Sequence, residues 1–158
     1  MKDNIEKIVR LLDSKGKTIS TMESCTGGCV VNEITNIEGA SDVLHYSAIT
    51  YSNDFKIKMG VSKEIIDTYT VYSIETAREM SKAISSFSSS DYGIGITGML
   101  NCSDPENPGG NPNKIYISIY MKDSDEYFDD SVEVFSIDRV ENKNTIVKRV
   151  IQMLENIL

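Results

Sequence analysis

Residues 18–28, Thr-Ile-Ser-Thr-Met-Glu-Ser-Cys-Thr-Gly-Gly, carry the pattern that decides the fold. Their first five residues are typical of a short strand, and Thr26-Gly27-Gly28 is expected to open a helix. In α/β proteins, ligands collect at the carboxyl ends of parallel strands. Ser24 lies just past such a strand end, so we interpret Glu23 to Gly28 as the candidate chemical site.

The chain on either side alternates between helical and strand patterns. Helical spacing of apolar residues, with Ser62 and Ser73 as expected N-caps, predicts helices over about 3–15, 26–37, 53–59, a short stretch after 62, 74–87 and 140–157. Strands are expected at residues 18–22, 43–51, 92–97, 115–121 and 127–135. Residues 98–113 hold all three prolines, which predicts a long loop.

The order of these elements predicts the sheet. Helices connect the first three strands, which implies parallel pairing with helices on both faces. The last two connections have no helix and are expected to be antiparallel hairpins, so the fourth strand runs against the other four. No repeat or linker interrupts the pattern, and we expect one α/β domain over residues 1–158.

Charge and hydropathy exclude several classes of function. The 158 residues include 16 basic and 24 acidic side chains, for a net charge of −8, and no basic cluster that could bind many phosphates. We therefore expect no nucleic-acid partner, although a helix N-terminus could still bind one small anion. No run approaches the roughly 18 apolar residues of a membrane span, and the first residues lack the apolar core of a secretory signal. The expected location is the cytoplasm, without membrane contact.

The cysteines predict neither disulfides nor a metal site. Cys25, Cys29 and Cys102 are an odd number in a chain without an export signal, and His45 is the one histidine. A zinc site would lack ligands, so small hydrophobic side chains in the core are the favoured interpretation.

Ser24 is the candidate nucleophile. Acyl transfer needs a nucleophile with charge-stabilising donors about 3 Å from the reacting atom, and the N–H groups at a glycine-rich helix start are such donors. Alternatively, Ser24 is an N-cap followed by a tight turn.

A serine nucleophile also needs a base. His45 stands alone, so a Ser-His-Asp triad is hard to assemble, but a lysine whose pKa is lowered by burial can take that role. Lys56 follows Tyr51-Ser52-Asn53 at the end of the second strand, from where it could reach Ser24. Alternatively, Lys56 is solvated and Tyr51 belongs to the core or its rim.

Several segments, taken together, resemble the CinA C-terminal domain family, whose characterised members are nicotinamide mononucleotide deamidases. They are Thr21 to Gly28, Gly39-Ala40-Ser41, Thr50 to Asn53 with Lys56, Gly60-Val61 and Ile96-Thr97-Gly98. The resemblance covers about residues 5–100 in register and returns weakly at Asp138-Arg139 and the last helix. It implies a three-layer α/β/α sandwich around a five-stranded mixed sheet.

The resemblance also implies an activity: hydrolysis of the carboxamide of nicotinamide mononucleotide to the nicotinic acid nucleotide and ammonia, without metal or cofactor. The implied roles are nucleophile for Ser24, base for Lys56, orientation of this pair for Tyr51, oxyanion or phosphate cradle for Thr26, Gly27 and Gly28, and pocket lining for Thr97 and Gly98. It further implies a small nucleotide substrate and a homo-oligomer, dimeric or larger.

The chain departs from the family pattern in one long segment. The family has a short glycine-rich stretch after Thr-Gly, where this chain has Gly98 to Asn113 with Gly109-Gly110 and then Lys114. Two alternatives follow: a nucleotide-binding or regulatory module without catalysis, and a hydrolase of another small amide or ester. Cys25 in place of Ser24 as nucleophile is a variant of the last.

Overall fold

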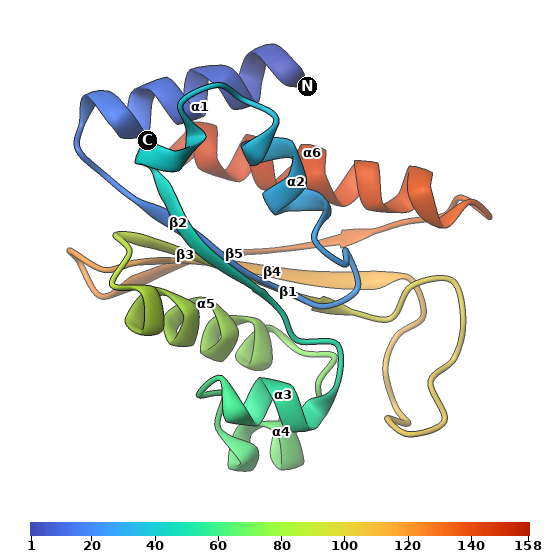
Figure 1. Cartoon of the computed structure of the whole chain (residues 1–158). Coiled ribbons are helices and arrows are strands. Elements are labelled where there is room, and N and C mark those ends of the chain that lie inside the picture. Colours follow the sequence, from blue (N-terminus) through green and yellow to red (C-terminus); the bar gives the residue numbers. More distant parts are fainter.

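The computed structural model describes residues 1–158 (Figure 1). The helices are α1 (Lys2–Ser14), α2 (Cys29–Thr35), α3 (Asn53–Lys58), α4 (Lys63–Tyr69), α5 (Ile74–Ser88) and α6 (Arg139–Ile157), with a 3₁₀ turn at Ala40–Asp42. The strands are β1 (Ile19–Glu23), β2 (Leu44–Ile49), β3 (Tyr92–Gly98), β4 (Lys114–Met121) and β5 (Glu126–Glu133). Each predicted element is present, with ends shifted by a few residues.

The five strands form one mixed sheet in the order β2-β1-β3-β4-β5. The central strand pair β1–β3 and the pair β1–β2 are parallel, whereas β4 is antiparallel to both β3 and β5. The predicted topology, with the fourth strand opposed to the rest, is confirmed.

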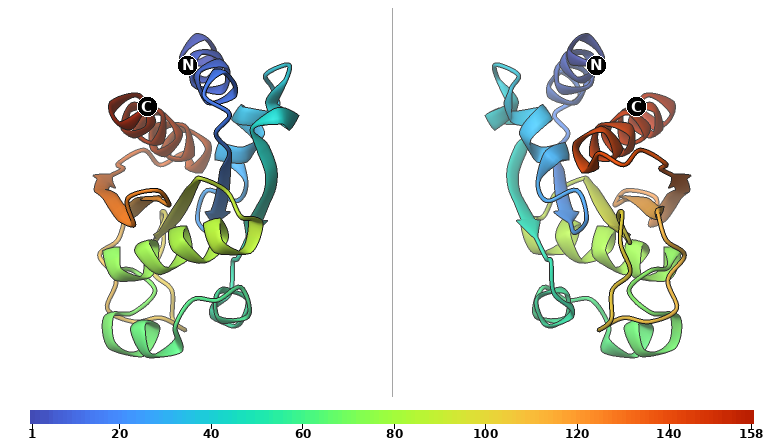
Figure 2. Two further views of the ribbon diagram at one scale, coloured as in Figure 1. Left: turned by 90° about the vertical axis from the view of Figure 1, so that its left-hand side faces the viewer. Right: turned by 90° about the vertical axis from the view of Figure 1, so that its right-hand side faces the viewer.

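Helices cover both faces of the sheet (Figures 1 and 2). On one face, α1, α2 and α6 pack over a core of 24 buried apolar residues that includes Leu12, Ile34 and Ile146. On the other face lies α5, with α3 and α4 beyond it, around six buried residues: Met22, Val61, Ile66, Val71, Met80 and Ile84. The predicted three-layer sandwich is confirmed.

Strand β3 lies unusually close to α5. A Cβ added at Gly95 would stand 2.1 Å from the Ala77 carbonyl oxygen, and one at Gly93 would stand 2.0 Å from that of Ser81. Any side chain at these positions would push helix and sheet apart, which explains the two glycines.

Serine side chains cap three of the helices. The Ser52, Ser62 and Ser73 hydroxyls accept hydrogen bonds from the first turns of α3, α4 and α5. Helix α2, however, begins at Cys29 rather than at Thr26, because Gly27 and Gly28 have φ of 63° and 93° and form a turn.

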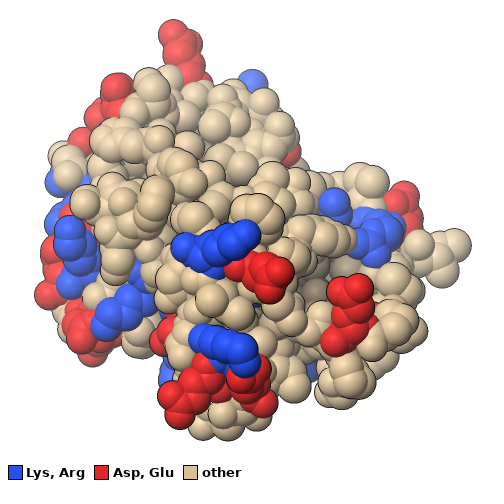
Figure 3. Space-filling view, turned by 60° about the horizontal axis from the view of Figure 1, so that its bottom comes forward, with Lys and Arg blue, Asp and Glu red and all other residues tan.

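The surface carries both signs of charge. On the face seen from the side of α3 and α4, blue and red side chains stand next to one another (Figure 3). No helix combines the length and the apolar character that crossing a membrane would require.

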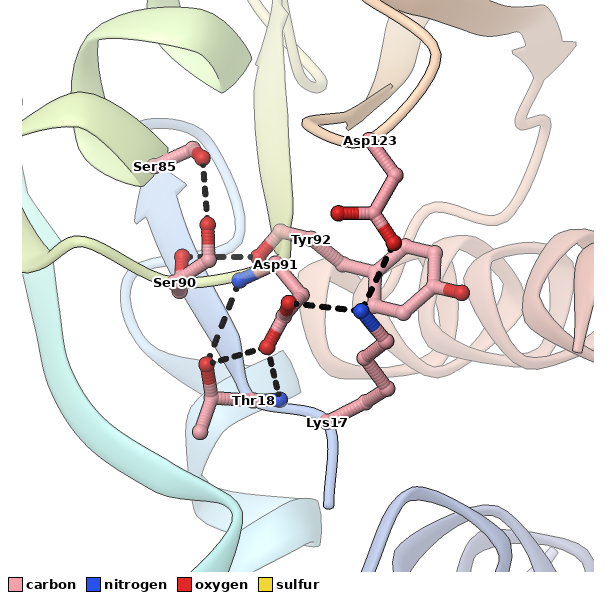
Figure 4. Close-up of polar contacts among 7 residues, drawn as sticks. All are labelled: Lys17, Thr18, Ser85, Ser90, Asp91, Tyr92 and Asp123. Atoms are coloured by element: carbon pink, nitrogen blue, oxygen red, sulfur yellow. Dashed lines mark hydrogen bonds and ion pairs between the residues drawn. The ribbon is translucent and has the colours of Figure 1, made fainter. Parts of the chain in front are cut away.

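A polar network holds the amino ends of the two central parallel strands (Figure 4). The Asp91 carboxylate accepts hydrogen bonds from the backbone N–H and the hydroxyl of Thr18, at 2.8 and 2.9 Å, and from Lys17 Nζ at 3.0 Å. Lys17 also binds Asp123 at 2.7 Å. Strands β1 and β3 are thereby fixed at the end of the sheet opposite Ser24.

Candidate active site

Ser24 directly follows β1 at the carboxyl edge of the parallel strands. Its backbone N–H donates to the Ile96 carbonyl oxygen at 3.1 Å, so the residue continues the pairing with β3. The side chain is 9% exposed. The serine is therefore held by the sheet itself.

Lys56 reaches Ser24 from the short helix α3. The segment before that helix is tied to the same strand, because the Thr50 N–H donates to the Glu23 carbonyl oxygen at 2.9 Å. Lys56 Nζ donates to Ser24 Oγ at 3.1 Å and to the Thr50 carbonyl oxygen at 2.8 Å, and the side chain is only 2% exposed. The structure thus joins the two residues that the sequence analysis paired.

The surroundings of Lys56 favour the neutral amine. Burial lowers the pKa of Lys56 from 10.5 to about 8, and the nearby Cys25 and Asp104 oppose this shift only in part. No carboxylate forms an ion pair with Lys56. With a pKa of about 8, roughly a tenth of the amine is unprotonated at pH 7 and can accept a proton.

Ser24 and Lys56 line a cavity of about 430 Å³, a volume typical of small-molecule sites. Tyr51, Thr97 and Gly98 also line it. The Tyr51 side chain is 67% exposed and makes no hydrogen bond to Ser24 or Lys56, whereas the Thr97 hydroxyl donates to the Val71 carbonyl oxygen at 2.6 Å.

The predicted cradle at Thr26, Gly27 and Gly28 requires a correction. These residues do not line the cavity, and the first N–H groups of α2 are already occupied by a buried side chain. The Glu23 carboxylate accepts from the backbone N–H groups of Gly28, Val30 and Val31 at 3.0, 3.2 and 2.9 Å. This internal anion takes the place at the helix N-terminus that a ligand would need.

The alternative of Ser24 as a helix cap is also wrong. The N-cap of α2 is Gly28, and the Ser24 hydroxyl faces Lys56 instead. The backbone N–H groups of Cys25 and Thr26 have no acceptor within the protein, and these two follow the serine directly.

Cys25 is not suited to be the nucleophile. Its side chain is buried, and burial raises the pKa of the thiol to about 12. The group therefore stays a protonated thiol near neutral pH and is a weak nucleophile. No group of three His, Cys, Asp or Glu side chains is arranged to hold a metal ion.

Three further cavity residues were not among the predicted site residues. Arg139, the first residue of α6, lines the cavity and donates to the Leu100 carbonyl oxygen. Tyr72 and Asp104 face the cavity from the loop before α5 and from the loop after β3, and the Tyr72 hydroxyl donates to Asp104 at 2.6 Å. In the sequence, the only signal for Arg139 was the weak family resemblance at Asp138-Arg139. No local pattern could have assigned Tyr72 or Asp104 to the site.

Comparison with known proteins identifies the family of the chain. The sequence model of the CinA C-terminal domain matches residues 1–158. The chain belongs to the CinA C-terminal domain family. A CinA-like protein of Kosmotoga olearia is 40% identical over 121 residues, which are 73% of this chain and 28% of that protein. A competence-damage inducible protein of Caldicellulosiruptor saccharolyticus is 35% identical over 151 residues, 94% of this chain and 36% of that protein.

The chain thus spans about a third of the length of these curated CinA relatives. Solved structures of the superfamily share its fold. A CinA superfamily protein of Enterobacter cloacae has a TM-score of 0.89 at 21% identity, covering 99% of this chain and 92% of its own. A competence/damage inducible protein of Agrobacterium tumefaciens has a TM-score of 0.82 at 26% identity, and the match covers 97% of this chain and 94% of that protein.

Proposed function

We propose that this CinA domain is an amidohydrolase that converts nicotinamide mononucleotide to nicotinic acid mononucleotide and ammonia. One observation carries the proposal: a buried lysine whose pKa is lowered to about 8 lies 3.1 Å from the hydroxyl oxygen of a serine, and both residues line a cavity. Serine activation by a neutral amine is a known route to acyl transfer. The choice of substrate rests on the resemblance of the surrounding motifs to nicotinamide mononucleotide deamidases.

The proposed reaction runs in two halves. Ser24 Oγ attacks the carboxamide carbon while Lys56 Nζ takes its proton, and a tetrahedral oxyanion forms. Lys56 then returns the proton to the leaving nitrogen, so ammonia departs and an ester joins the acyl group to Ser24. Water, deprotonated by Lys56, cleaves this ester and releases the carboxylate, after which serine and lysine regain their first state.

The remaining contacts of the cavity support this chemistry. The unoccupied N–H group of Cys25, which lines the cavity, is the best candidate to bind the oxyanion, in place of Thr26, Gly27 and Gly28. Arg139 is the one arginine of the cavity lining and suits the phosphate of the nucleotide. For Tyr51 we propose contact with the substrate at the rim.

Ammonia release from nicotinamide mononucleotide tests the proposal. We expect turnover by the unaltered chain and a loss of at least about 10³-fold in Ser24→Ala, because the covalent step is removed. Ser86→Ala, an exposed serine on α5, is the matched control and should keep full activity. Turnover that survives Ser24→Ala would refute the mechanism.

A second candidate is a nucleotide-binding module without catalysis. It is supported by residues 102–107, which line the cavity from a loop that differs from the family pattern. Nucleotide binding raises the melting temperature of a native protein by mass action. Such a rise without ammonia release, for the unaltered chain, would favour this candidate.

A further inference from the structure

The cavity carries carboxylates as well as cations. Lys56 and Arg139 are its basic lining residues, and Asp104 and Glu106, both on the loop between β3 and β4, are its acidic ones. A cavity built only to bind a phosphate would gain nothing from these carboxylates, because they repel anions. Their presence therefore bears on which part of a ligand lies beside them.

Asp104 is held in one orientation by three donors. Its Oδ2 accepts from the Tyr72 hydroxyl at 2.6 Å and from Asn107 Nδ2 at 2.8 Å, and its Oδ1 accepts from the Glu106 N–H at 3.0 Å. These hydrogen bonds, that of Tyr72 foremost, keep the pKa of Asp104 below its usual value. The carboxylate is therefore ionised at neutral pH.

The loop that carries Asp104 is fixed at two points. Asn53, the first residue of α3, donates to Asn107 Oδ1 at 2.7 Å. Gly110 packs directly on Tyr72, since an added Cβ would lie 2.4 Å from the tyrosine ring. Asn107 thus joins Asp104 to the helix that carries Lys56, and the negative charge has a defined place near the reacting groups.

We propose that Asp104 is a specificity-determining residue that selects an amide carried on a permanently cationic aromatic ring. This rests on the proposed amidohydrolase function and deepens it. A pyridinium ring beside Asp104 meets an opposite charge, and the half-buried Tyr72 ring offers an aromatic surface on which such a cation can lie. A neutral ring of the same shape would gain neither the charge attraction to Asp104 nor the cation–π contact with Tyr72.

The same charge acts on the base. Asp104 raises the pKa of Lys56, opposing the effect of burial. A cationic ring bound between them screens Asp104 and repels the ammonium form of Lys56. A cationic substrate therefore favours the neutral form of Lys56, which accepts the proton of the Ser24 hydroxyl. A neutral substrate has no such effect.

Binding of two small probes tests the selection without requiring turnover. The probes are 1-methylnicotinamide, which is a cation, and nicotinamide, which is neutral, titrated into the full chain by calorimetry. We expect the unaltered chain to prefer the cation by about three- to tenfold, the range expected of a partly exposed charge contact, and Asp104→Asn to lose this preference. Equal binding of both probes, no binding of either, or a preference that persists in Asp104→Asn would overturn the proposal.

Two variants separate the charge from the fold. Asp125 accepts a hydrogen bond from Tyr120 at 2.8 Å, as Asp104 does from Tyr72, but does not line the cavity. Asp125→Asn is therefore the matched control and should keep the preference. Tyr72→Phe keeps the ring and the carboxylate, so it should retain part of the preference even if the loop is less firmly held.

Kinetics add a second readout. In Asp104→Asn, the midpoint of the acid limb of kcat/KM for nicotinamide mononucleotide should fall to lower pH, because a charge that stabilises the Lys56 ammonium is gone. An unmoved midpoint would contradict the influence on the base. Loss of cation preference in Asp104→Asn, in a chain that releases no ammonia, would uphold the selection by Asp104 and refute the amidohydrolase proposal.

Discussion

At the scale of single residues, the site depends on one buried amine. Lys56 is almost fully enclosed, yet its only polar partners are Ser24 Oγ and the Thr50 carbonyl oxygen. Neither partner carries a charge that would offset the desolvation of an ammonium group. This is the physical reason for its low pKa, and it has consequences for both rate and stability.

The pH dependence of the reaction should follow this amine. We expect kcat/KM for nicotinamide mononucleotide to rise with pH to a plateau, with its midpoint near pH 8, because only unprotonated Lys56 can accept the serine proton. Ammonia release measured between about pH 6 and 10 checks this. A profile that is flat across this range would exclude Lys56 as the base.

Burial of Lys56 should also lower the free energy of unfolding. Its folded-state pKa of about 8 lies below the unfolded value of 10.5, a difference of about 3 kcal/mol. The cost is fully present below pH 8 and disappears as the pH rises to 10.5, where the amine is neutral in both states. We expect Lys56→Met to raise the free energy of unfolding by about 1–2 kcal/mol at pH 7, after the loss of two hydrogen bonds is subtracted.

Urea denaturation at pH 7 and at pH 10.5 measures this effect. At the higher pH the gain of Lys56→Met should turn into a loss of about 1–2 kcal/mol, because only the two missing hydrogen bonds then count. Lys58→Met, an exposed lysine on the same helix, is the control and should change the unfolding free energy by less than about 0.5 kcal/mol. A Lys56→Met chain that is less stable than the unaltered one at pH 7 would contradict the assigned pKa.

At the scale of elements, the turn between β1 and α2 is organised by Glu23. The helix has only seven residues, too few to be stable alone, and its first N–H groups donate to this buried carboxylate. Glu23 thereby fixes the path of the chain from the sheet through Ser24 to α2. It is a positioning residue for the serine.

Replacing this carboxylate should loosen the turn. We expect Glu23→Gln to lower the free energy of unfolding by about 2–4 kcal/mol, because the amide group cannot accept all three backbone hydrogen bonds. Amide exchange at residues 28–31 should accelerate. Glu64→Gln, an exposed glutamate in the first turn of α4, is the control, and a loss no larger than that of this control would refute the role of Glu23.

At the scale of the whole molecule, apolar side chains remain uncovered from the end of β5 to the first turn of α6. Phe135, Ile137 and Val140 are 81, 99 and 64% exposed. Such exposure in neighbouring residues is typical of contact surfaces. It supports the homo-oligomer expected from the family resemblance, which we keep as a proposal.

Sedimentation equilibrium at micromolar concentrations tests the assembly. We expect a mass at least twice the 17.6 kDa of one chain, and a shift toward the monomer in Ile137→Ser. Lys122→Ser, on the exposed turn between β4 and β5, should leave the mass unchanged. A monomeric unaltered chain would end this proposal.

The sequence by itself determined the elements, their order and the pairing of Ser24 with Lys56. Apolar periodicity and serine caps are local signals, and the helical crossovers leave little freedom in how β1, β2 and β3 pair. Ser24 and Lys56 could be paired because both follow parallel strands, whose carboxyl ends must meet at one edge of the sheet.

Only the tertiary structure decided which groups surround that pair. The glycine-rich turn looked like an anion cradle, but Glu23 folds back and takes its N–H groups, a contact that no spacing rule reveals. Asp104 and Arg139 enter the cavity from segments distant in the chain. Charge, burial and the pKa of Lys56 depend on such long-range packing, and local sequence patterns carry no information about it.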